Sequence, residues 1–447
     1  MTSDLIIIGS GPGGYRTAEH AAQKGMTVTI FEKGEAGGTC LNCGCIPTKT
    51  LCRHAEILDT LRESEVYGLE GLSYQFNFAR VMERKREVTA ALRQGVETLM
   101  GAPGITFVRA EARFKDAHTI IANGEEYTAK NIIIATGSRA KMPPIKGIDL
   151  PHVLTSTELL EIESLPKRLC IVGAGVIGME FASIFNSFGV EVTVVEFLKE
   201  CLPALDSDIA KRLRQTIGKR GVNFFMQSGV KEITAEHVIF ERKGKTEQVE
   251  ADMVLIATGR AANTEGLGLE DAGVIFDRNG IQTDEHLQTN VPGIYAIGDA
   301  NGKCMLAHAA TFQGLHVVNH LIGEDDGIRL DLVPSAIFTH PEAAGVGMTE
   351  DLCKAKGIEY VCKKGYYRAN GKALAMHETD GLVKLLARND GRILGCHIYG
   401  AHASDMVQEI SSLMTKGVTV KELADMIHTH PTLSEILQET AMTFLLR

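Results

Sequence analysis

Three cysteines lie close together near the N-terminus and could carry thiol–disulfide chemistry: Cys40, Cys43 and Cys45. Cys40 and Cys45 are five positions apart, a spacing that a disulfide can close if the backbone bends, and Gly44 permits such a bend. Pro47 fits the first turn of a helix. A cysteine at a helix N-terminus faces unpaired N–H groups and the positive end of the dipole, which favours its thiolate. We therefore predict that Cys45 is a stabilised thiolate and that Cys40 is its disulfide partner.

Two other interpretations of these cysteines stay open at this point. The three could ligate a metal with Cys52 as a fourth ligand, although the paired spacing typical of zinc sites is missing. They could also be buried structural thiols, the usual state of cysteine in an intracellular protein. Ten cysteines in 447 residues do not make a disulfide scaffold. We therefore expect a reducing cytoplasm, where a cysteine pair is more often catalytic than structural.

A second candidate pair, His430 and Glu435, lies close to the C-terminus. A carboxylate beside an imidazole keeps the ring oriented and basic near neutral pH, as a general base requires. Taken alone, such a pair is more often an ordinary surface pair.

Two glycine-rich units must position these side chains. Residues 5–32 and 169–196 share one order: a short apolar strand, a glycine loop, a helix, and a second strand that ends in an acid. The two units lie 164 residues apart, and their loops are 9–14 and 173–178. A single G-x-G-x-x-G motif is weak evidence for nucleotide binding. Two copies, each with a strand before it, a helix after it and an acid at the same distance, indicate two dinucleotide-binding units.

The chemistry of both units follows from the same physics. Glycines let the backbone approach a pyrophosphate at the positive end of the helix, and the acid binds ribose hydroxyls. The structural alternative is a glycine-rich turn that joins a strand to a helix without binding a ligand. In the second unit, Glu196 would repel a 2′-phosphate, and Lys199 is the only nearby cation. This unit is therefore expected to prefer NAD over NADP.

The first unit is expected to hold the flavin, because the cysteine segment directly follows it and must reach a redox ring. Residues 131–137 and 254–259 are apolar strands that both end in Ala-Thr-Gly, which brings backbone close to a nucleotide. Residues 293–299 form a strand that ends in a small-residue turn and Asp299. The alternative role of Asp299 is that of a helix N-cap.

Residues 37–49 read Gly-Gly-Thr-Cys-Leu-Asn-Cys-Gly-Cys-Ile-Pro-Thr-Lys and resemble the redox-active segment of the dihydrolipoamide dehydrogenases, within the pyridine nucleotide–disulfide oxidoreductases. The resemblance runs along essentially the whole chain. Residues 293–308 resemble the second flavin-binding segment of that family, 333–342 the start of its interface domain, and 428–435 its catalytic dyad. Cys43 departs from the family, which usually carries an apolar residue there, so its role stays open.

The resemblance implies a flavoprotein that oxidises a protein-bound dihydrolipoyl dithiol and reduces NAD. His430, held by Glu435, would take a proton from the substrate dithiol as that dithiol attacks Cys40, and Cys45 would face the flavin as a thiolate. In that family the dyad enters the site of the neighbouring subunit, which implies an obligate homodimer. The lipoyl group would come from another protein, in a 2-oxoacid dehydrogenase complex or the glycine cleavage system.

The motifs and the resemblance together predict the cofactor-binding residues. On the FAD side they are Gly9, Gly11, Gly14, Glu32, Gly38, Thr39, Lys49, Ala112, Gly137, Asp299 and Ala307. On the NAD side they are Gly173, Gly175, Gly178, Glu180, Glu196, Val230 and Gly259. The resemblance further implies an ion pair between Lys49 and Glu180 beside the flavin.

The expected fold is α/β, with two Rossmann-like domains for FAD and NAD and a C-terminal α+β dimerisation domain. The length of 447 residues suggests about three domains. The predicted bounds are 1–140 for the FAD domain, 141–260 for the NAD domain, 261–331 for a segment that completes the FAD site, and 332–447 for the interface domain.

Composition argues against two classes of partner, and the motifs allow three rival functions to be weighed. A net charge of −10 without a basic block argues against nucleic acid and anionic membrane surfaces, and no apolar run could span a bilayer. A reductase of a small disulfide, of the glutathione-reductase type, shares the cysteine pair and the histidine but usually needs NADPH, which Glu196 opposes. A mercuric reductase is disfavoured because no vicinal cysteines end the chain. A non-enzymatic redox sensor would not need Cys40, His430 and Glu435 together.

Overall fold

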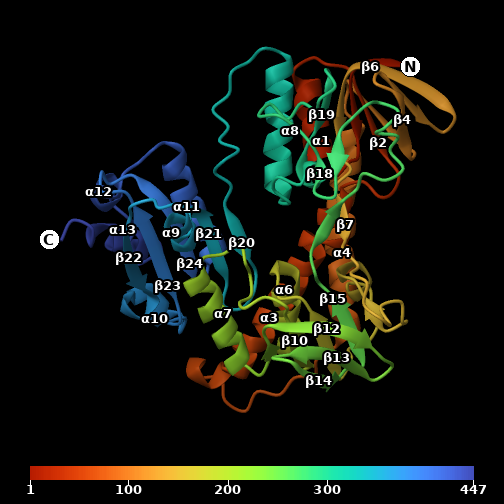
Figure 1. The fold of residues 1–447 in the computed structure, drawn as a ribbon. Helices are drawn as coiled ribbons and strands as arrows, with labels where there is room; N and C mark the ends of the chain where they lie inside the picture. Colours follow the sequence, from red (N-terminus) through yellow and green to blue (C-terminus); the bar gives the residue numbers. More distant parts are fainter. Residues whose placement is uncertain (447) are drawn as a thin grey trace.

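Short apolar runs that lead into glycine-rich turns form the central parallel strands of two separate sheets, one for each glycine-rich unit. The computed structural model describes residues 1–446. Figure 1 shows the first sheet at the upper right, the second below it, and the C-terminal domain in blue to the left. The predicted fold class, two Rossmann-like units and a C-terminal α+β domain, is confirmed.

The first unit is built on a seven-stranded sheet of order β3-β2-β1-β6-β5-β4, with β19 paired to β6. The strands are β1 (Thr2–Ile8), β2 (Val28–Glu32), β3 (Ile105–Arg109), β4 (Ala112–Asp116), β5 (Thr119–Ala122), β6 (Glu125–Ile134) and β19 (Ile294–Ala296). Its helices are α1 (Pro12–Gln23), α2 (Gly38–Cys43), α3 (Cys45–Arg62), α4 (Phe78–Met100) and α8 (Ala307–Leu321). β19 and α8 come from late in the sequence, so the chain returns to complete this unit.

The second unit has a five-stranded parallel sheet of order β11-β10-β9-β15-β8 and a three-stranded antiparallel sheet. The first sheet contains β8 (Val153–Leu154), β9 (Arg168–Val172), β10 (Glu191–Val195), β11 (Asn223–Phe225) and β15 (Met253–Ile256). The second contains β12 (Ser228–Ile233), β13 (His237–Arg242) and β14 (Lys245–Glu250). The helices are α5 (Ser156–Leu159), α6 (Val176–Ser187) and α7 (Ser207–Lys219).

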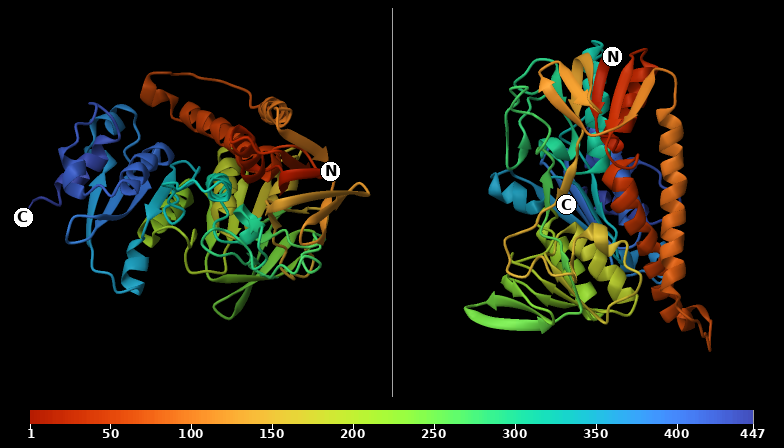
Figure 2. Two further views of the ribbon diagram at one scale, coloured as in Figure 1. Left: turned by 90° about the horizontal axis from the view of Figure 1, so that it is seen from above. Right: turned by 90° about the vertical axis from the view of Figure 1, so that its right-hand side faces the viewer.

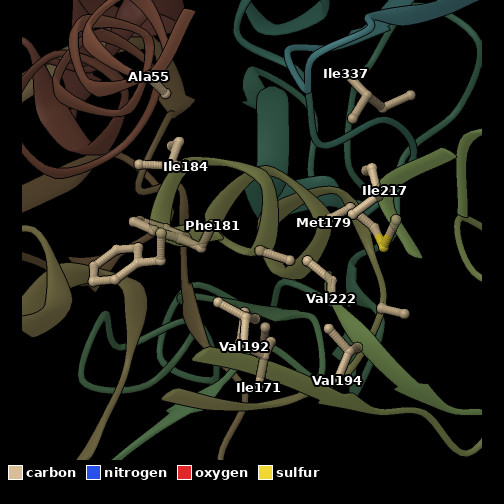
Figure 3. Packing of buried hydrophobic residues seen from close by; sticks show 14 of the residues in the cluster. Ala55, Ile171, Met179, Phe181, Ile184, Val192, Val194, Ile217, Val222 and Ile337 are labelled. Carbon is tan, nitrogen blue, oxygen red and sulfur yellow. The ribbon is translucent and has the colours of Figure 1, made fainter. Parts of the chain in front are cut away.

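Helix α6 lies at the centre of the largest core cluster. Figure 3 shows Met179, Phe181 and Ile184 of α6 among side chains of β9 and β10 in the five-stranded sheet, with Ala55 of α3 and Ile337 nearby. Helices α4 and α3 run lengthwise beside the two units (Figure 2). The core therefore joins the second unit to the helix that carries Cys45.

The C-terminal domain is a five-stranded antiparallel sheet of order β20-β21-β24-β23-β22. Its strands are β20 (Ser335–Ile337), β21 (Ala343–Gly347), β22 (Val361–Tyr366), β23 (Leu382–Ala387) and β24 (Ile393–Tyr399). Its helices are α9 (Glu350–Ala355), α10 (Gly371–Ala375), α11 (Ala403–Thr415), α12 (Val420–Asp425) and α13 (Glu435–Met442).

Two short strands connect the first and second units. β7 (Ser138–Ala140) pairs antiparallel with β16 (Arg260–Ala262), so the chain leaves the first unit on one strand and returns on the other. The predicted bound between 140 and 141 follows β7, whereas the bound between 260 and 261 falls inside β16. In residues 1–446, no helix is both long and apolar enough to cross a bilayer.

Candidate active site

The cysteine segment folds as two helices separated by one glycine. Cys40 lies in α2, and Cys45 is the first residue of α3, with Pro47 as its third residue. A Cβ atom on Gly44 would lie 2.9 Å from the carbonyl oxygen of Thr39, so only glycine lets the chain turn this tightly. Cys45 therefore faces the unpaired N–H groups of the first turn of α3.

The structure brings the thiols of Cys40 and Cys45 together. Both are free thiols that line one cavity. Stabilisation of its thiolate by the neighbouring Cys40 S–H lowers the pKa of Cys45 to about 7, against the effect of burial and with help from the Lys49 ammonium. The same interaction and burial raise the pKa of Cys40. Cys45 is therefore the thiol that ionises first, as a charge-holding sulfur must.

Cys43 makes different contacts. Burial raises the pKa of its thiol, which faces Thr157 of α5 in the second unit, and Thr157 partly opposes that rise. Cys52, further along α3, is a half-buried thiol whose pKa is raised because partial burial disfavours its thiolate. Within residues 1–446, no group of three or more His, Cys, Asp or Glu side chains is arranged to hold a metal ion.

Lys49 and Glu180 form an ion pair beside the cysteines. The Lys49 ammonium donates to both Glu180 oxygens, at 3.0 and 2.9 Å, and thereby links α3 to α6. The backbone N–H of Phe338 also donates to Glu180, at 3.0 Å. Phe338 was given no role from the sequence, although it lies within the segment 333–342 that resembles the start of the interface domain.

The first glycine loop leaves space where a nucleotide would lie. Gly9 has φ +105°, and a Cβ there would be 2.4 Å from the Ala135 carbonyl oxygen. A Cβ on Gly14 would be 1.9 Å from the Gly9 carbonyl oxygen, so these two glycines are needed for close packing. A Cβ on Gly11 would meet only the Gly38 Cα, at 4.0 Å. Gly11 therefore borders open space at the start of α1, where a pyrophosphate fits.

The second loop repeats this geometry. Gly173 has φ +108°, and its Cβ would be 2.5 Å from the Ala257 carbonyl oxygen. A Cβ on Gly178 would be 2.0 Å from the Gly173 carbonyl oxygen, whereas one on Gly175 would have no neighbour within 4 Å. Glu196 accepts hydrogen bonds from the backbone N–H groups of residues 174 and 198, at 2.5 and 2.6 Å.

A single cavity of about 2260 Å³ extends from the first loop past the cysteines to the second loop. It is lined by nearly all the predicted cofactor residues: Gly9, Gly11, Glu32, Gly38, Thr39, Lys49, Ala112, Gly137, Gly173, Gly175, Glu180, Glu196, Val230, Gly259, Asp299 and Ala307. Cys40 and Cys45 line it as well. Gly14 and Gly178 do not line the cavity, because they pack helix against strand behind it. The glycine-lined space at a helix N-terminus, open to the cysteine pair, fits FAD in the first unit.

Asp299 lies inside the short helix Gly298–Asn301 and does not cap it. Its carboxylate accepts a hydrogen bond from Ser138, and the Arg260 Nε is 3.9 Å away. Sequence reasoning missed Ser138 and Arg260, although each follows one of the two Ala-Thr-Gly segments.

The predicted dyad forms, but at a distance from the cysteines of its own chain. His430 Nδ1 is 2.9 Å from Glu435 Oε1, and Glu435 Oε2 accepts the Thr432 N–H at 2.7 Å. These two hydrogen bonds lower the pKa of Glu435 and keep it anionic. The His430 side chain is 80% exposed, and the cavity lining of the same chain does not include it. The C-terminal domain thus presents the imidazole outward.

Comparisons with known proteins give a consistent result over the whole chain. Residues 3–314 match the family model of the pyridine nucleotide-disulphide oxidoreductases, and residues 333–441 match the dimerisation domain of that family, which supports the predicted homodimer. A dihydrolipoyl dehydrogenase of Geobacillus stearothermophilus is 38% identical over 452 residues, which cover 99% of this chain and 96% of the relative. One of Bacillus subtilis (strain 168) is 40% identical over 462 residues, with 98% and 97% covered.

Among solved structures, the HOCl-induced flavoprotein disulfide reductase RclA from Escherichia coli is similar in fold. It superposes with a TM-score of 0.88 at 31% identity, and the match covers 99% of this chain and 100% of that one.

Proposed function

The chain belongs to the pyridine nucleotide-disulphide oxidoreductases, and we propose that it works as a dihydrolipoyl dehydrogenase, oxidising a protein-bound dihydrolipoyl dithiol with NAD as the electron acceptor. The observation that carries this proposal is the pair of free thiols, Cys40 and Cys45, in one cavity with both glycine loops. A disulfide between these sulfurs could accept two electrons from a dithiol within reach of both nucleotides.

The proton and thiol chemistry follows from the residues. The imidazole of the partner subunit's His430 takes a proton from one substrate thiol, and the resulting thiolate attacks Cys40. The Cys40–Cys45 bond breaks, and Cys45 leaves as a thiolate that Lys49 stabilises. The second substrate thiol then displaces Cys40 and closes the lipoyl disulfide; its proton passes to Cys40, which ends as a thiol, and the proton held by His430 is released to solvent. The substrate has lost two electrons, which the Cys40–Cys45 pair now holds.

FAD, when bound in the first unit, supplies a two-electron carrier between the reduced thiol pair and NAD. The backbone of loop 9–14 would hold its pyrophosphate, and Glu32 and Asp299 would bind its hydroxyl groups. Loop 173–178 and Glu196 would hold NAD in the same way, and the Glu196 carboxylate would disfavour a 2′-phosphate.

A reductase of a small disulfide with NADPH is the main alternative. The similarity in fold to RclA, a protein named as a flavoprotein disulfide reductase, supports this alternative. Glu196 argues against NADPH, and the exposed dyad of His430 and Glu435 fits a large substrate that approaches across a subunit boundary. We propose a lipoyl-bearing protein of a 2-oxoacid dehydrogenase complex or the glycine cleavage system as that substrate.

The proposal is tested by NADH production from dihydrolipoamide and NAD, run beside oxidation of NADPH with glutathione disulfide. We expect fast turnover only in the first assay. The Cys45→Ser variant should lose activity by at least about a thousandfold, because no disulfide can form. Cys43→Val is the matched control and should keep activity, because Cys43 faces Thr157. Turnover only with NADPH, or loss of activity in Cys43→Val, would contradict the proposal.

The assignment of His430 to the neighbouring site needs a separate experiment. We expect the Cys45→Ser variant and the His430→Gln variant each to be nearly inactive when expressed alone. The two variant chains are then co-expressed so that mixed dimers form. If the dyad acts across the subunit boundary, each mixed dimer contains one intact site, and the mixture recovers about a quarter of wild-type activity. If the dyad acts within its own chain, no intact site forms and no activity returns.

A further inference from the structure

Phe338 of the C-terminal domain touches both members of the ion pair beside the cysteines. It directly follows β20, its N–H donates to Glu180 at 3.0 Å, and its ring centroid is 4.6 Å from the Lys49 Nζ. This residue therefore contacts the carboxylate through its backbone and the ammonium through its side chain. It does so in its own chain, whereas the His430 dyad faces outward.

The two charges differ in how firmly they are held. The Glu180 side chain is 4% exposed and accepts three hydrogen bonds, two from Lys49 and one from Phe338. Lys49 carries its ammonium on a flexible four-carbon stem, so the position of that charge depends on the groups that it touches. The negative face of an aromatic ring attracts an ammonium, so the Phe338 ring restrains the mobile member of the pair.

The position of the ammonium matters for Cys45. The groups that titrate or carry charge around this thiol are Cys40, Lys49 and Glu180. Lys49 follows Cys45 by four residues on α3, so both lie on one face of the helix. Its charge favours the Cys45 thiolate, whereas the charge of Glu180 disfavours it. If the ammonium moved outward, the fixed carboxylate would be left to oppose the thiolate.

We propose that Phe338 is a positioning residue, whose ring keeps the Lys49 ammonium on Glu180 and beside the Cys45 sulfur. The inference rests on the proposed role of Cys45 as the charge-holding thiol. It gives the C-terminal domain two roles in the homodimer: through Phe338 it shapes the cysteine site of its own chain, and through His430 it serves the site of the partner.

The test measures the ionisation of Cys45 directly, in a background that cannot form the disulfide. Cys40→Ser, whose hydroxyl keeps a hydrogen-bond donor at that position, is pulsed as the holoenzyme with iodoacetamide from pH 5.5 to 9, and mass spectrometry quantifies alkylation of the peptide that contains Cys45. Phe338→Leu removes the ring but keeps the backbone N–H. We expect it to raise the pH midpoint by about half a unit, with about threefold slower alkylation below the midpoint.

Two further variants separate the ring from a general loss of packing. Phe338→Tyr keeps an aromatic face and should keep the parent midpoint. Phe76→Leu removes a partly exposed ring that packs against Phe188, away from the ion pair, and should also keep it. Lys49→Met gives the shift for complete loss of the ammonium, which we expect to exceed that of Phe338→Leu. If Phe338→Leu does not fold, Phe338→Met is measured in its place with the same expectation.

The outcomes distinguish this inference from the proposed function. A parent midpoint well above the neutral range would overturn the role of Cys45 itself. A parent midpoint near neutrality that Phe338→Leu leaves unchanged would overturn only the role of Phe338. An equal shift in Phe338→Tyr would also overturn it, because the ring would then not be the cause.

Discussion

The two glycine loops have nearly the same local geometry but different surroundings. In both units the acid accepts hydrogen bonds from equivalent backbone N–H groups: Glu32 from residues 10 and 34, and Glu196 from residues 174 and 198. Each first glycine lies against the alanine of an Ala-Thr-Gly segment. The duplication of the sequence is therefore also a duplication of hydrogen bonds.

The difference lies in what covers each loop. At the first loop, a Cβ on Gly13 would meet Ala310 of α8 and Ile297 at 3.2 Å, and Gly38 of the cysteine segment lies against Gly11. At the second loop, Gly175 has no neighbour within 4 Å, and Phe197 is 77% exposed. An enclosed loop suits a resident cofactor, and an open loop suits a nucleotide that must bind and leave at each turnover. The same motif thus serves two kinds of ligand because of its neighbours.

The largest expected effect comes from the last glycine of each loop. Gly14→Ala and Gly178→Ala each place a Cβ within about 2 Å of a carbonyl oxygen, which costs about 1–3 kcal/mol or displaces the helix. We expect Gly14→Ala to purify with less than about a tenth of its flavin. Gly178→Ala should keep its flavin but bind NAD at least about tenfold more weakly. Visible absorbance and NAD titration measure the two effects, and flavin loss in both variants would contradict the division of roles.

The junction of the second unit with the C-terminal domain predicts a dependence of stability on pH. His340 lies between Asp59 and Glu378, with Arg220 nearby. Burial disfavours its charged form, but hydrogen bonds to the two carboxylates outweigh this and raise the pKa to about 9. Its contribution, on the order of 2 kcal/mol, is fully present below pH 6.5 and is lost as the pH rises through 9.

Thermal unfolding of the holoenzyme from pH 6 to 9.5 measures this contribution. The wild-type midpoint should fall across the alkaline half of the range, and His340→Asn should be less stable at pH 6 with a flatter profile. Parallel profiles for the two proteins would show that His340 does not hold this junction.

Helix α8, which covers the first loop, can be displaced by a substitution that lies outside both loops. Gly314 of α8 lies against α1, and a Cβ there would be 1.7 Å from the Thr17 hydroxyl. Gly314→Ala should push α8 outward and speed flavin release several-fold, because overpacking is relieved by moving the helix. Release is followed by flavin fluorescence on dilution. NAD affinity is the internal control and should not change. An unchanged rate of flavin release would mean that the packing of α8 on α1 does not limit flavin release.

A further predicted effect separates the two acids. Glu196→Gln removes the negative charge but keeps an acceptor oxygen, so preference for NAD over NADP should fall by about tenfold, which corresponds to about 1.4 kcal/mol. Glu32→Gln is the matched variant in the first unit and should leave this preference unchanged. The ratio of kcat/KM for the two nucleotides gives the answer. An equal shift in both variants would show that the change acts through the fold.

The features that were predicted correctly from the sequence are those that depend on residues close together in the chain. The two units, the loop glycines and the cysteine segment were predicted because a turn against a carbonyl oxygen admits only glycine, and because the helix start after Gly44 is encoded nearby. The contacts made by Phe338, Ser138 and Arg260 were missed. Each joins segments more than a hundred residues apart, so no local pattern marks its partner.

By itself, the sequence determined the family, the duplicated loops, the reactive cysteine segment and the pairing of His430 with Glu435, because each depends on residue types at short spacing. The tertiary structure alone decided which loop is covered, that Cys43 turns towards Thr157, and that Phe338 sits over Lys49. It also decided that the dyad faces outward from its own chain. These features arise from the packing of elements that are distant in sequence, where burial and electrostatic contacts, not local propensity, select the arrangement.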